Sequence, residues 1–423
     1  MSGSLFIGID VGTSACRACT IDERAAVVAE ARIDLPAATR TGACVEQDAG
    51  IWWRALTDTL DVLCKRLNPA QVSRIAVDGT SATLLLCDKH GTPLTPGLMY
   101  NDARSISEAG HILETAPADC AAQGASSSLA KLLYLRQTIS DPAYLALHQA
   151  DWLSGMLTGQ FGISDENNAL KLGYDPLQRR WPDWLSRLDI KPEHVPVVCP
   201  AGSPIGTLSR ILAKRWNLPD DVEVVAGTTD STAGFIAAGA DVTGTAVTAL
   251  GSTLVIKVLS DQPVFVAHYG VYSHRLGDRW LVGGASNAGG ATLTKFFNPC
   301  DIHRYTRLIN PQQTTGLDYY PLPAAGERFP LADPKLQPRL EPRPWSDATF
   351  FQGILEGLAT IEQRGYRLLA ELGAPYPQKV LTVGGGAKNA AWMRIREQCL
   401  AVPVARAAHQ EAAFGAALLA RGF

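Results

Sequence analysis

Two aspartates stand where apolar runs of the sequence end. Asp230 closes VVAGTTD (residues 224–230) and precedes small residues that can form a helix. A carboxylate there suits a general base serving a small polar substrate, and it equally suits the N-terminal cap of a helix. Asp10 closes LFIGID and lies beside the turn VGTS. It can hold Mg²⁺ while the hydroxyls of Thr13 and Ser14 meet phosphate oxygens, or it can merely bond the turn amides.

Four glycine-rich turns each follow an apolar run. Turns of this kind expose backbone N–H groups that can bind phosphate. One such turn is weak support, because tight hairpins also need glycine. Four of them favour a nucleotide site, although the chain has no G-x-x-x-x-G-K-[ST] motif of the Walker type. Gly385 and Gly386 would let the backbone lie flush against a flat ligand such as adenine, or they belong to a plain strand-to-helix connector. The turns are DVGTS (10–14), GTTDS (227–231), GSTL (251–254) and GGGAKN (384–389).

Hydrophobic periodicity predicts the elements that position these turns. A strand is expected before each turn, and the first turn joins LFIGID and CRACTID in a hairpin. A long amphipathic helix is expected over 350–372, with Gly373 after its end, and the Pro-rich residues 311–345 are expected to be irregular. The other predicted elements are strands at 74–78, 221–226, 245–250 and 379–383 and helices at 50–66, 126–137, 231–239 and 390–400.

A further small polar turn, GTSAT (79–83), follows the strand that ends at Asp78. Such a turn could face a substrate, or it could close a hairpin with the next strand, LLLCD. Both interpretations fit the sequence.

The two halves of the chain share a pattern. IDVGTSACRACTI and TALGSTLVIKVLS both read as strand, Gly-Ser/Thr turn and strand, and Gly12 and Gly251 lie 239 positions apart. This spacing indicates an internal duplication of a domain. The small-residue run AAGADVTG could act as a hinge, so we expect two domains, at 1–240 and 241–423.

The composition is ordinary for a globular protein, with 46% hydrophobic and 19% charged residues. A net charge of −3, from 38 basic and 41 acidic residues, gives little support for binding to nucleic acid or to anionic membranes. Nine cysteines among apolar neighbours are typical of a reduced compartment, and the Cys16–Cys19 pair lacks the partners of a zinc site. The N-terminus resembles no signal peptide, and no stretch reaches the roughly 18 apolar residues of a membrane span. We therefore expect a cytoplasmic protein.

Taken in order, these turns resemble the motifs of the FGGY carbohydrate kinases, members of the actin-like ATPase superfamily. FIGIDVGTSACRACTID resembles the first phosphate motif of that family, and VEQDAGIWW (45–53) resembles its EQDP-x-x-WW segment, with Ala49 in place of proline. Residues 77–105 resemble the sugar-site strand and the W-x-D-x-R segment after it. The other matches are AGTTDSTAGFIAAGA with the catalytic-aspartate motif, GTAVTALGST with the second phosphate motif and LTVGGGAKNAAWMRIREQCLAVPV with the adenosine motif.

The resemblance implies two actin-like (ribonuclease H-like) α/β domains flanking a deep cleft. Sugar would bind mainly to residues 1–240 and ATP with Mg²⁺ mainly to residues 241–423, in a monomer or homodimer. Asp230 would be the general base that takes the proton from the sugar hydroxyl, Asp10 would lie near Mg²⁺ and the reactive end of the sugar, and Ser81 would contact the sugar. The nucleotide contacts implied are Gly12, Thr13 and Ser14 at the first phosphate turn, Gly251, Ser252 and Thr253 at the second, and Gly385, Gly386 and Asn389 at the adenosine site.

The sugar-site turn departs from the pattern of xylulose kinases. Those enzymes usually show Gly-Gln-Met-His-Gly where this chain has GTSAT, so Ser81 and Ala82 replace the Met and His that contact the sugar. Tyr100 replaces the usual Trp, and the chain is shorter than most family members. The pattern resembles the short plant and cyanobacterial branch that includes D-ribulose kinases, so D-ribulose is the expected substrate. D-xylulose, L-ribulose, glycerol and polyols stay open, as do an ATP-switching binding protein and a non-catalytic sugar sensor.

Overall fold

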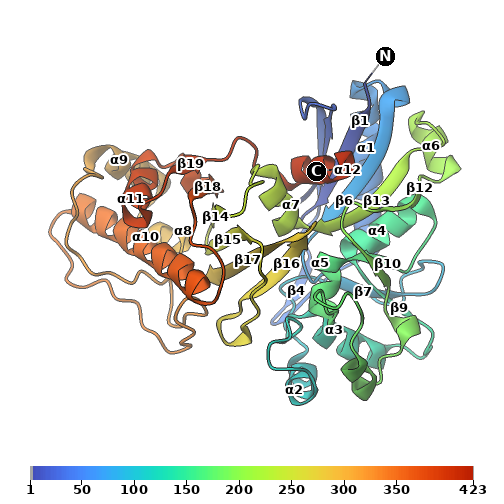
Figure 1. Cartoon of the computed structure of the whole chain (residues 1–423), viewed down its shortest axis with the longest axis horizontal. Helices are drawn as coiled ribbons and strands as arrows, with labels where there is room; N and C mark the ends of the chain where they lie inside the picture. Colours follow the sequence, from blue (N-terminus) through green and yellow to red (C-terminus); the bar gives the residue numbers. More distant parts are fainter. Residues whose placement is uncertain (1–2, 423) are drawn as a thin grey trace. The chain divides into compact units, whose positions relative to one another are not determined.

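The predicted hairpin is present as β1 (Leu5–Val11) and β2 (Ala15–Ile21) in a computed structural model that describes residues 3–422. It belongs to a six-stranded sheet in the order β12-β13-β6-β1-β2-β3 (Figure 1). Strands β1, β6 and β13 run parallel, so their C-terminal ends meet at one edge of the sheet. The other strands of this sheet are β6 (Val72–Gly79), β13 (Glu223–Thr229), β12 (Pro204–Thr207) and β3 (Val27–Asp34).

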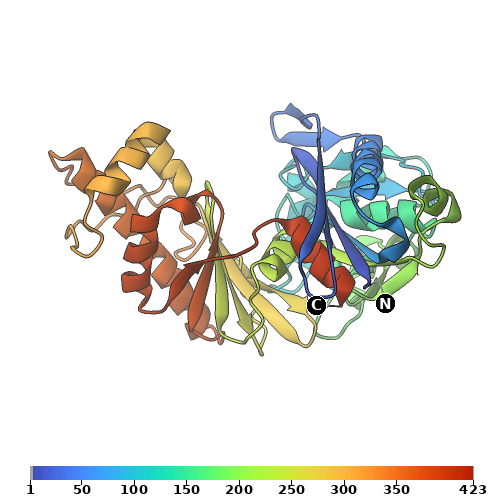
Figure 2. The same ribbon diagram turned by 90° about the horizontal axis from the view of Figure 1, so that it is seen from above.

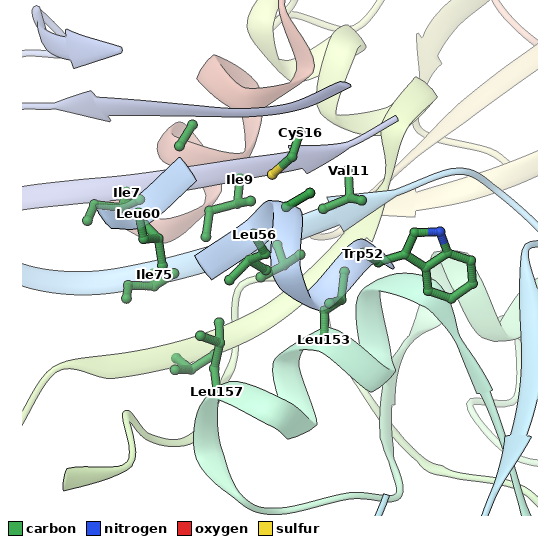
Figure 3. Close-up of a cluster of buried hydrophobic side chains, with 14 of the residues drawn as sticks. Ile7, Ile9, Val11, Cys16, Trp52, Leu56, Leu60, Ile75, Leu153 and Leu157 are labelled. Carbon is green, nitrogen blue, oxygen red and sulfur yellow. The ribbon is translucent and has the colours of Figure 1, made fainter. Parts of the chain in front are cut away.

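One face of this sheet, the face covered by α1 (Ala49–Leu63) and α4 (Gln149–Thr158), carries the hydrophobic core. Ile7, Ile9 and Val11 alternate along β1 and pack toward these two helices (Figure 3). Because successive side chains of a strand point to opposite faces, the even-numbered residues of β1, Asp10 among them, lie on the other face.

Helix α12 (Ala412–Arg421) packs against this strand (Figure 2) and against α7 (Asp230–Ala237). A Cβ at Gly8 of β1 would lie 2.1 Å from the Ala413 carbonyl oxygen, and one at Gly415 of α12 would lie 1.8 Å from that of Ala233. Only glycine permits so close a backbone approach.

The chain divides into unit 1, Met1–Ala237 with Glu411–Phe423, and unit 2, Ala238–Gln410. The first division falls near the expected boundary at 240. The C-terminal assignment differs from the expected 241–423, because α12 completes the core of unit 1 through its close contacts with β1 and α7.

A second sheet in unit 1 overturns one interpretation of GTSAT. Strand β7 (Leu84–Cys87) lies in a five-stranded sheet, order β4-β5-β8-β7-β9, that does not contain β6. Residues 80–83 therefore cross from one sheet to the other, and the hairpin interpretation is wrong. The other elements of unit 1 are β4 (Thr39–Thr41), β5 (Cys44–Gln47), β8 (Gly97–Leu98), β9 (Leu145–His148), α2 (Ile106–Thr115), α3 (Ser128–Leu135), β10 (Ile163–Asp165), α5 (Glu166–Ala169), β11 (Val197–Cys199) and α6 (Arg210–Trp216).

Unit 2 repeats the topology of the first sheet, as the duplicated sequence pattern predicts. Its order is β16-β17-β15-β14-β18-β19, in which β14, β15 and β17 pair antiparallel and β14, β18 and β19 pair parallel. In unit 1, β1, β2 and β3 pair antiparallel, and β1, β6 and β13 pair parallel in the same way. The strands are β14 (Thr245–Leu250), β15 (Leu254–Ser260), β16 (Tyr272–Leu276), β17 (Arg279–Ser286), β18 (Lys379–Val383) and β19 (Val404–Arg406).

Helices cover this second sheet. The predicted long helix is α10 (Asp347–Glu371), capped by Ser346, whose side chain accepts from the Thr349 amide. Residues 309–346 contain no helix or strand, which confirms the irregular segment expected from its prolines. The remaining helices are α8 (Gly290–Phe296), α9 (Pro299–Leu308) and α11 (Ala390–Leu400).

Across residues 3–422, no helix combines the length and the apolar character needed to cross a bilayer. All nine cysteines are free thiols.

Candidate active site

Three carboxylates gather at the edge of the unit 1 sheet where the parallel strands end. Asp10 of β1 and Asp78 of β6 are direct register partners, and Asp78 is also paired with Thr228 of β13, two residues before Asp230. Asp10 is 6% exposed and Asp78 is fully buried, whereas Asp230 is half-buried. The structure thus brings together two predicted site residues and adds Asp78, which the sequence marked only as the residue before GTSAT.

Burial and mutual repulsion change how these carboxyl groups ionise. Burial, with the charge of Asp230 as a second cause, raises the pKa of Asp10 to about 6. Burial also raises the pKa of Asp78 well above its usual value, and the charges of Asp10 and Asp230 add to the effect. Neighbouring carboxyl groups whose pKa values are raised by burial and by each other's charge are typical of an active site.

Asp10 is paired with a guanidinium. Arg17 Nη1 donates to Asp10 Oδ2 over 3.2 Å, and Arg17 Nε lies 3.6 Å from Glu411 Oε2. The Gly12 amide donates to the Ala15 carbonyl, not to Asp10, so the idea that Asp10 serves to bond this amide fails. Sequence reasoning missed Arg17, although Arg17 stands directly opposite Asp10 in the predicted hairpin.

The turn between β1 and β2 presents the first set of predicted phosphate contacts. Thr13 and Ser14 are exposed and Gly12 is half-buried. They follow Val11, the last residue of β1, so the turn lies at the same edge of the sheet as Asp10.

Asp230 is the first residue of α7. Its Oδ1 accepts from the Ser231 amide over 2.6 Å, and Thr229 Oγ1 lies 3.0 Å from Thr232 Oγ1. A negative charge in the first turn is stabilised by the helix dipole. Asp230 thus lies one position after the N-terminal cap that the sequence suggested, although its side chain still bonds an amide of the first turn. This position is compatible with a general base.

The crossing loop after Asp78 carries Ser81, which is half-buried. Gln149, the first residue of α4, accepts from both the Thr80 amide and the Thr80 hydroxyl at 3.0 Å. Thr80 Oγ1 also lies 2.5 Å from Thr83 Oγ1. Hydrogen bonds to Gln149 and between Thr80 and Thr83 therefore hold the loop on both sides of Ser81 in place.

A buried lysine fixes the same loop from the other side. Lys131 of α3 is fully buried, and its Nζ donates to the carbonyls of Ala82 and Met99 at 2.7 Å each. Ala82 has a φ of 63°, a left-handed conformation that is unusual for a residue with a Cβ. Burial lowers the pKa of Lys131 to about 7. Sequence reasoning missed both Gln149 and Lys131, because each lies far along the chain from the loop that it holds.

In unit 2 the turn between β14 and β15 presents Gly251, Ser252 and Thr253. Gly251 and Ser252 are exposed, and the Gly251 amide donates to the Thr253 carbonyl over 3.1 Å. From the start of α8, Gly290 N donates to Gly251 O (2.8 Å) and Ala291 N donates to Ser252 O (3.1 Å). The turn therefore rests on α8 and points its outer side to solvent.

The three glycines after β18 serve different purposes. Gly384 has a φ of 86°, and a Cβ there would lie 2.8 Å from the Leu250 carbonyl oxygen. A Cβ at Gly386 would lie 2.6 Å from Leu250 Cβ and from the Trp392 ring. At Gly385 a Cβ would meet nothing within 4 Å. Internal packing thus explains Gly384 and Gly386, and only Gly385 faces open space.

Asn389 ends this loop and begins α11. Its Oδ1 accepts from the Trp392 amide over 3.0 Å, and its Nδ2 donates to Thr306 Oγ1 of α9 over 2.9 Å. An open groove of about 450 Å³ lies beside the loop, bordered by Ala387 and Lys388 and by the facing sides of α11 and β19.

The residues present fit a magnesium ion that travels with a nucleotide. Among residues 3–422 no three His, Cys, Asp or Glu side chains are arranged to hold a metal by themselves. Asp10 can supply one carboxylate oxygen, and Mg²⁺ commonly takes one or two carboxylates together with phosphate oxygens and water.

Comparison with known proteins matches both units to one family. Residues 5–237 match the N-terminal domain of the FGGY family of carbohydrate kinases, and residues 242–421 match its C-terminal domain. A xylulose kinase from Staphylococcus epidermidis is 24% identical over 99% of this chain and 88% of its own length. A structure described as a xyloylose kinase from Brucella ovis has a TM-score of 0.89 at 25% identity and covers 99% of this chain and 90% of its own. A glycerol kinase from Plasmodium falciparum, solved with ADP, has the same fold with a TM-score of 0.87 at 16% identity, covering 99% and 89%.

These matches bear out the expected actin-like fold. They do not support the expected closeness to D-ribulose kinases, since the similar proteins named above are a xylulose kinase, a xyloylose kinase and a glycerol kinase.

Proposed function

Because the chain belongs to the FGGY family of carbohydrate kinases, we propose that it transfers the γ-phosphoryl group of ATP to a hydroxyl of a ketopentose, with Asp230 as general base. The observation that carries this proposal is the meeting of Asp10, Asp78 and Asp230 at one edge of the unit 1 sheet. Their environments differ, which is how one site can hold carboxylates beside a neutral acid, Asp78.

Asp230 is the group best placed to take a proton. It is half-buried, so a substrate can reach it, and it stands at the N-terminus of a helix that stabilises its charge. A sugar hydroxyl is a poor nucleophile, and a carboxylate within hydrogen-bond reach accepts its proton as the phosphoryl group leaves ADP. Asp78 is fully buried beside Asp10, its register partner, and its neutral form is favoured there.

Nucleotide binding draws on the glycine-rich turns. Gly251, Ser252 and Thr253 would contact phosphate oxygens through their amides and hydroxyls, as would Gly12, Thr13 and Ser14. The backbone at Gly385 and Gly386 and the side chain of Asn389 would hold the adenosine. Asp10 would hold Mg²⁺, which neutralises charge on the phosphates when bound.

For the sugar, we propose D-xylulose first, because the relatives similar over nearly the whole chain include an enzyme named for it. D-ribulose is the second candidate, favoured by Ser81 and Ala82, which replace the Met and His of the xylulose kinase pattern. A hydroxyl that the site leaves unpaired costs about 1–3 kcal/mol, enough for a smaller polar wall to select one epimer.

The test is ADP release with ATP and Mg²⁺ alone and then with D-xylulose, D-ribulose, L-ribulose or glycerol. We expect strong stimulation by one ketopentose in the wild type and in Asp220→Ala, a matched control at an exposed position before β13. Asp230→Ala should lose about 10²-fold or more of that rate.

Other outcomes would redirect the proposal. Stimulation by glycerol alone would keep the mechanism and change the substrate. ATP turnover that is independent of sugar and of Asp230 would indicate an ATP-switching binding protein, and sugar binding without product would indicate a sensor.

A further inference from the structure

The irregular segment 311–345 is built into the core of unit 2. Tyr319, Tyr320 and Phe329 are almost fully buried. A Cβ at Gly284 of β17 or at Gly365 of α10 would lie 2.7 Å from the Phe329 ring, so this ring fills space between strand and helix that only glycines leave open. The segment is therefore held in one place despite its lack of regular structure.

This segment delivers a buried carboxylate, Glu327, to the end of β17. Glu327 is 2% exposed. Its Oε2 accepts from the Ser286 hydroxyl (2.6 Å) and the Tyr320 hydroxyl (3.1 Å). Its Oε1 accepts from the amides of Asn287 (2.8 Å) and Arg328 (3.0 Å). The Phe329 amide also donates to Oε1, over 3.5 Å. A buried carboxylate with five donors fixes those donors firmly, because leaving any of them unpaired is costly.

Two of these donors lie outside the segment, at the point where β17 ends. Asn287 is held a second time, since its Nδ2 donates to the Gly326 carbonyl over 3.0 Å. The Ser286 hydroxyl, bound to Glu327, accepts from the Ala288 amide over 3.0 Å. Through these hydrogen bonds Glu327 fixes the backbone conformation of residues 286–288.

The residues that follow support the turn at 251–253. Ala288 O accepts from the Leu254 amide over 2.8 Å, and Gly290 N donates to Gly251 O over 2.8 Å. A Cβ at Gly289 would lie 2.5 Å from the Ser252 carbonyl oxygen, so the two backbones are in direct contact. The outer side of the turn is exposed, so its shape is imposed from this inner side.

We propose that Glu327 is a positioning residue for nucleotide binding, which holds the turn Gly251–Thr253 in its phosphate-binding shape through Ser286–Ala288. The proposal rests on the proposed function in one respect, that this turn contacts the nucleotide phosphates. It assigns the Pro-rich segment a role beyond packing: the segment carries the carboxylate that shapes the turn.

The test compares Glu327→Gln with Glu356→Gln, a matched control that acts on the same segment. Glu356 of α10 accepts from the Thr315 amide and hydroxyl, so its loss loosens the other end of the segment without touching Ser286 or Asn287. In Glu327→Gln the side chain keeps one acceptor oxygen, and its NH₂ group replaces the other. The donors that faced the replaced oxygen lose their acceptor.

We expect Glu327→Gln to raise the Kd for ADP, measured by calorimetry, and the KM for ATP by about tenfold, as substitutions behind a binding group commonly do. The KM for the sugar should stay within about twofold of that of Glu356→Gln. Equal ADP affinity in the two variants would overturn the proposal.

Two further variants cover the remaining outcomes. If Glu327→Gln does not fold, Ser286→Ala removes one contact of Glu327 together with the acceptor of the Ala288 amide, and it should still weaken ADP binding. Unchanged affinity in folded Ser286→Ala would also overturn the proposal. Gly251→Val tests the premise separately, because a Cβ there meets only ordinary contact, 3.6 Å from the Thr253 carbonyl oxygen. ADP affinity unchanged by Gly251→Val would refute the proposed nucleotide site itself. Affinity lost there but kept in Glu327→Gln would refute the positioning role alone.

Discussion

Single residues of unit 1 show how one sheet edge can hold acids of different character. Asp10 has a pKa of about 6 because burial and the charge of Asp230 outweigh the opposing effect of Arg17. Asp78 has no exposure at all, and its neutral form is favoured more strongly. Asp230 remains reachable at the start of a helix. The three residues are all aspartates, so their different burial and neighbours, and not the residue type, make their ionisation differ.

Lys131 supplies a pH-dependent prediction at the same scale. Burial lowers its pKa from the ordinary 10.5 to about 7. Between these values the unfolded chain keeps a proton that the folded protein has released, so the free energy of unfolding should rise with pH. Relative to Lys131→Met, which has no such group, wild type should gain up to about 1.4 kcal/mol per pH unit over this window.

Urea unfolding of both proteins from about pH 6 to pH 10 measures this difference. Ionisations common to both proteins cancel in the comparison. A difference that does not change with pH would show that Lys131 stays charged in the folded protein.

Among the elements, those fixed by local pattern were predictable from the sequence, and those fixed by distant contacts were not. The hairpin β1–β2 and the helix α10 follow from alternation and from a 3.6-residue period, so they lie close to their expected positions. Asp10 and Asp230 could be proposed because each ends an apolar run of the sequence. Arg17, Gln149 and Lys131 act through tertiary contacts that periodicity does not encode, and the passage of the chain from β6 to another sheet depends on pairing partners far away.

Helix α12 packs into unit 1 through contacts that no local pattern encodes, and this packing is open to a direct test. Gly415→Ala would put a Cβ 1.8 Å from the Ala233 carbonyl oxygen, so the helix must move away from α7. We expect a loss of about 1–3 kcal/mol in the free energy of unfolding, typical of an overpacked contact.

Gly234→Ala in α7 is the matched control for this prediction. A Cβ there meets nothing within 4 Å. Alanine in a helix interior should therefore stabilise the protein by about 0.5–1 kcal/mol. Chemical denaturation of the two variants gives both values, and equal effects would mean that the close α7–α12 approach is not maintained in solution.

Helices α10 and α11 are joined by a buried ion pair. Arg396 of α11 donates from Nε and Nη2 to Glu362 of α10 at 2.6 and 2.7 Å, and from Nη1 to Thr382 Oγ1 at 2.7 Å. Arg396→Ala leaves a buried carboxylate without its partner and should cost about 3–5 kcal/mol of unfolding free energy. Arg343→Ala, which breaks the exposed pair with Asp347, should cost less than about 1 kcal/mol when measured in the same way. A small loss for Arg396→Ala would show that water enters the gap and solvates Glu362.

For the whole molecule, the duplication gives each unit a sheet and a hydrophobic core of its own. The residues proposed for the sugar all lie in unit 1, and those proposed for the adenosine all lie in unit 2. A ligand that binds the folded form of one unit should therefore stabilise that unit, by about 2.7 kcal/mol at a concentration of 100 Kd.

Calorimetry of the full chain, with one destabilised variant for each unit, tests this division. Gly415→Ala should lower the transition that the ketopentose raises, because both act on unit 1. Arg396→Ala should lower the transition that adenosine raises, because the residues proposed for adenosine, Gly385, Gly386 and Asn389, all lie in unit 2. If each ligand instead offsets either variant equally, the two units unfold as one cooperative body, and stability must be assigned to the chain as a whole. Separate responses would show that each duplicated unit has a stability of its own, with the sugar contacts in one unit and the adenosine contacts in the other.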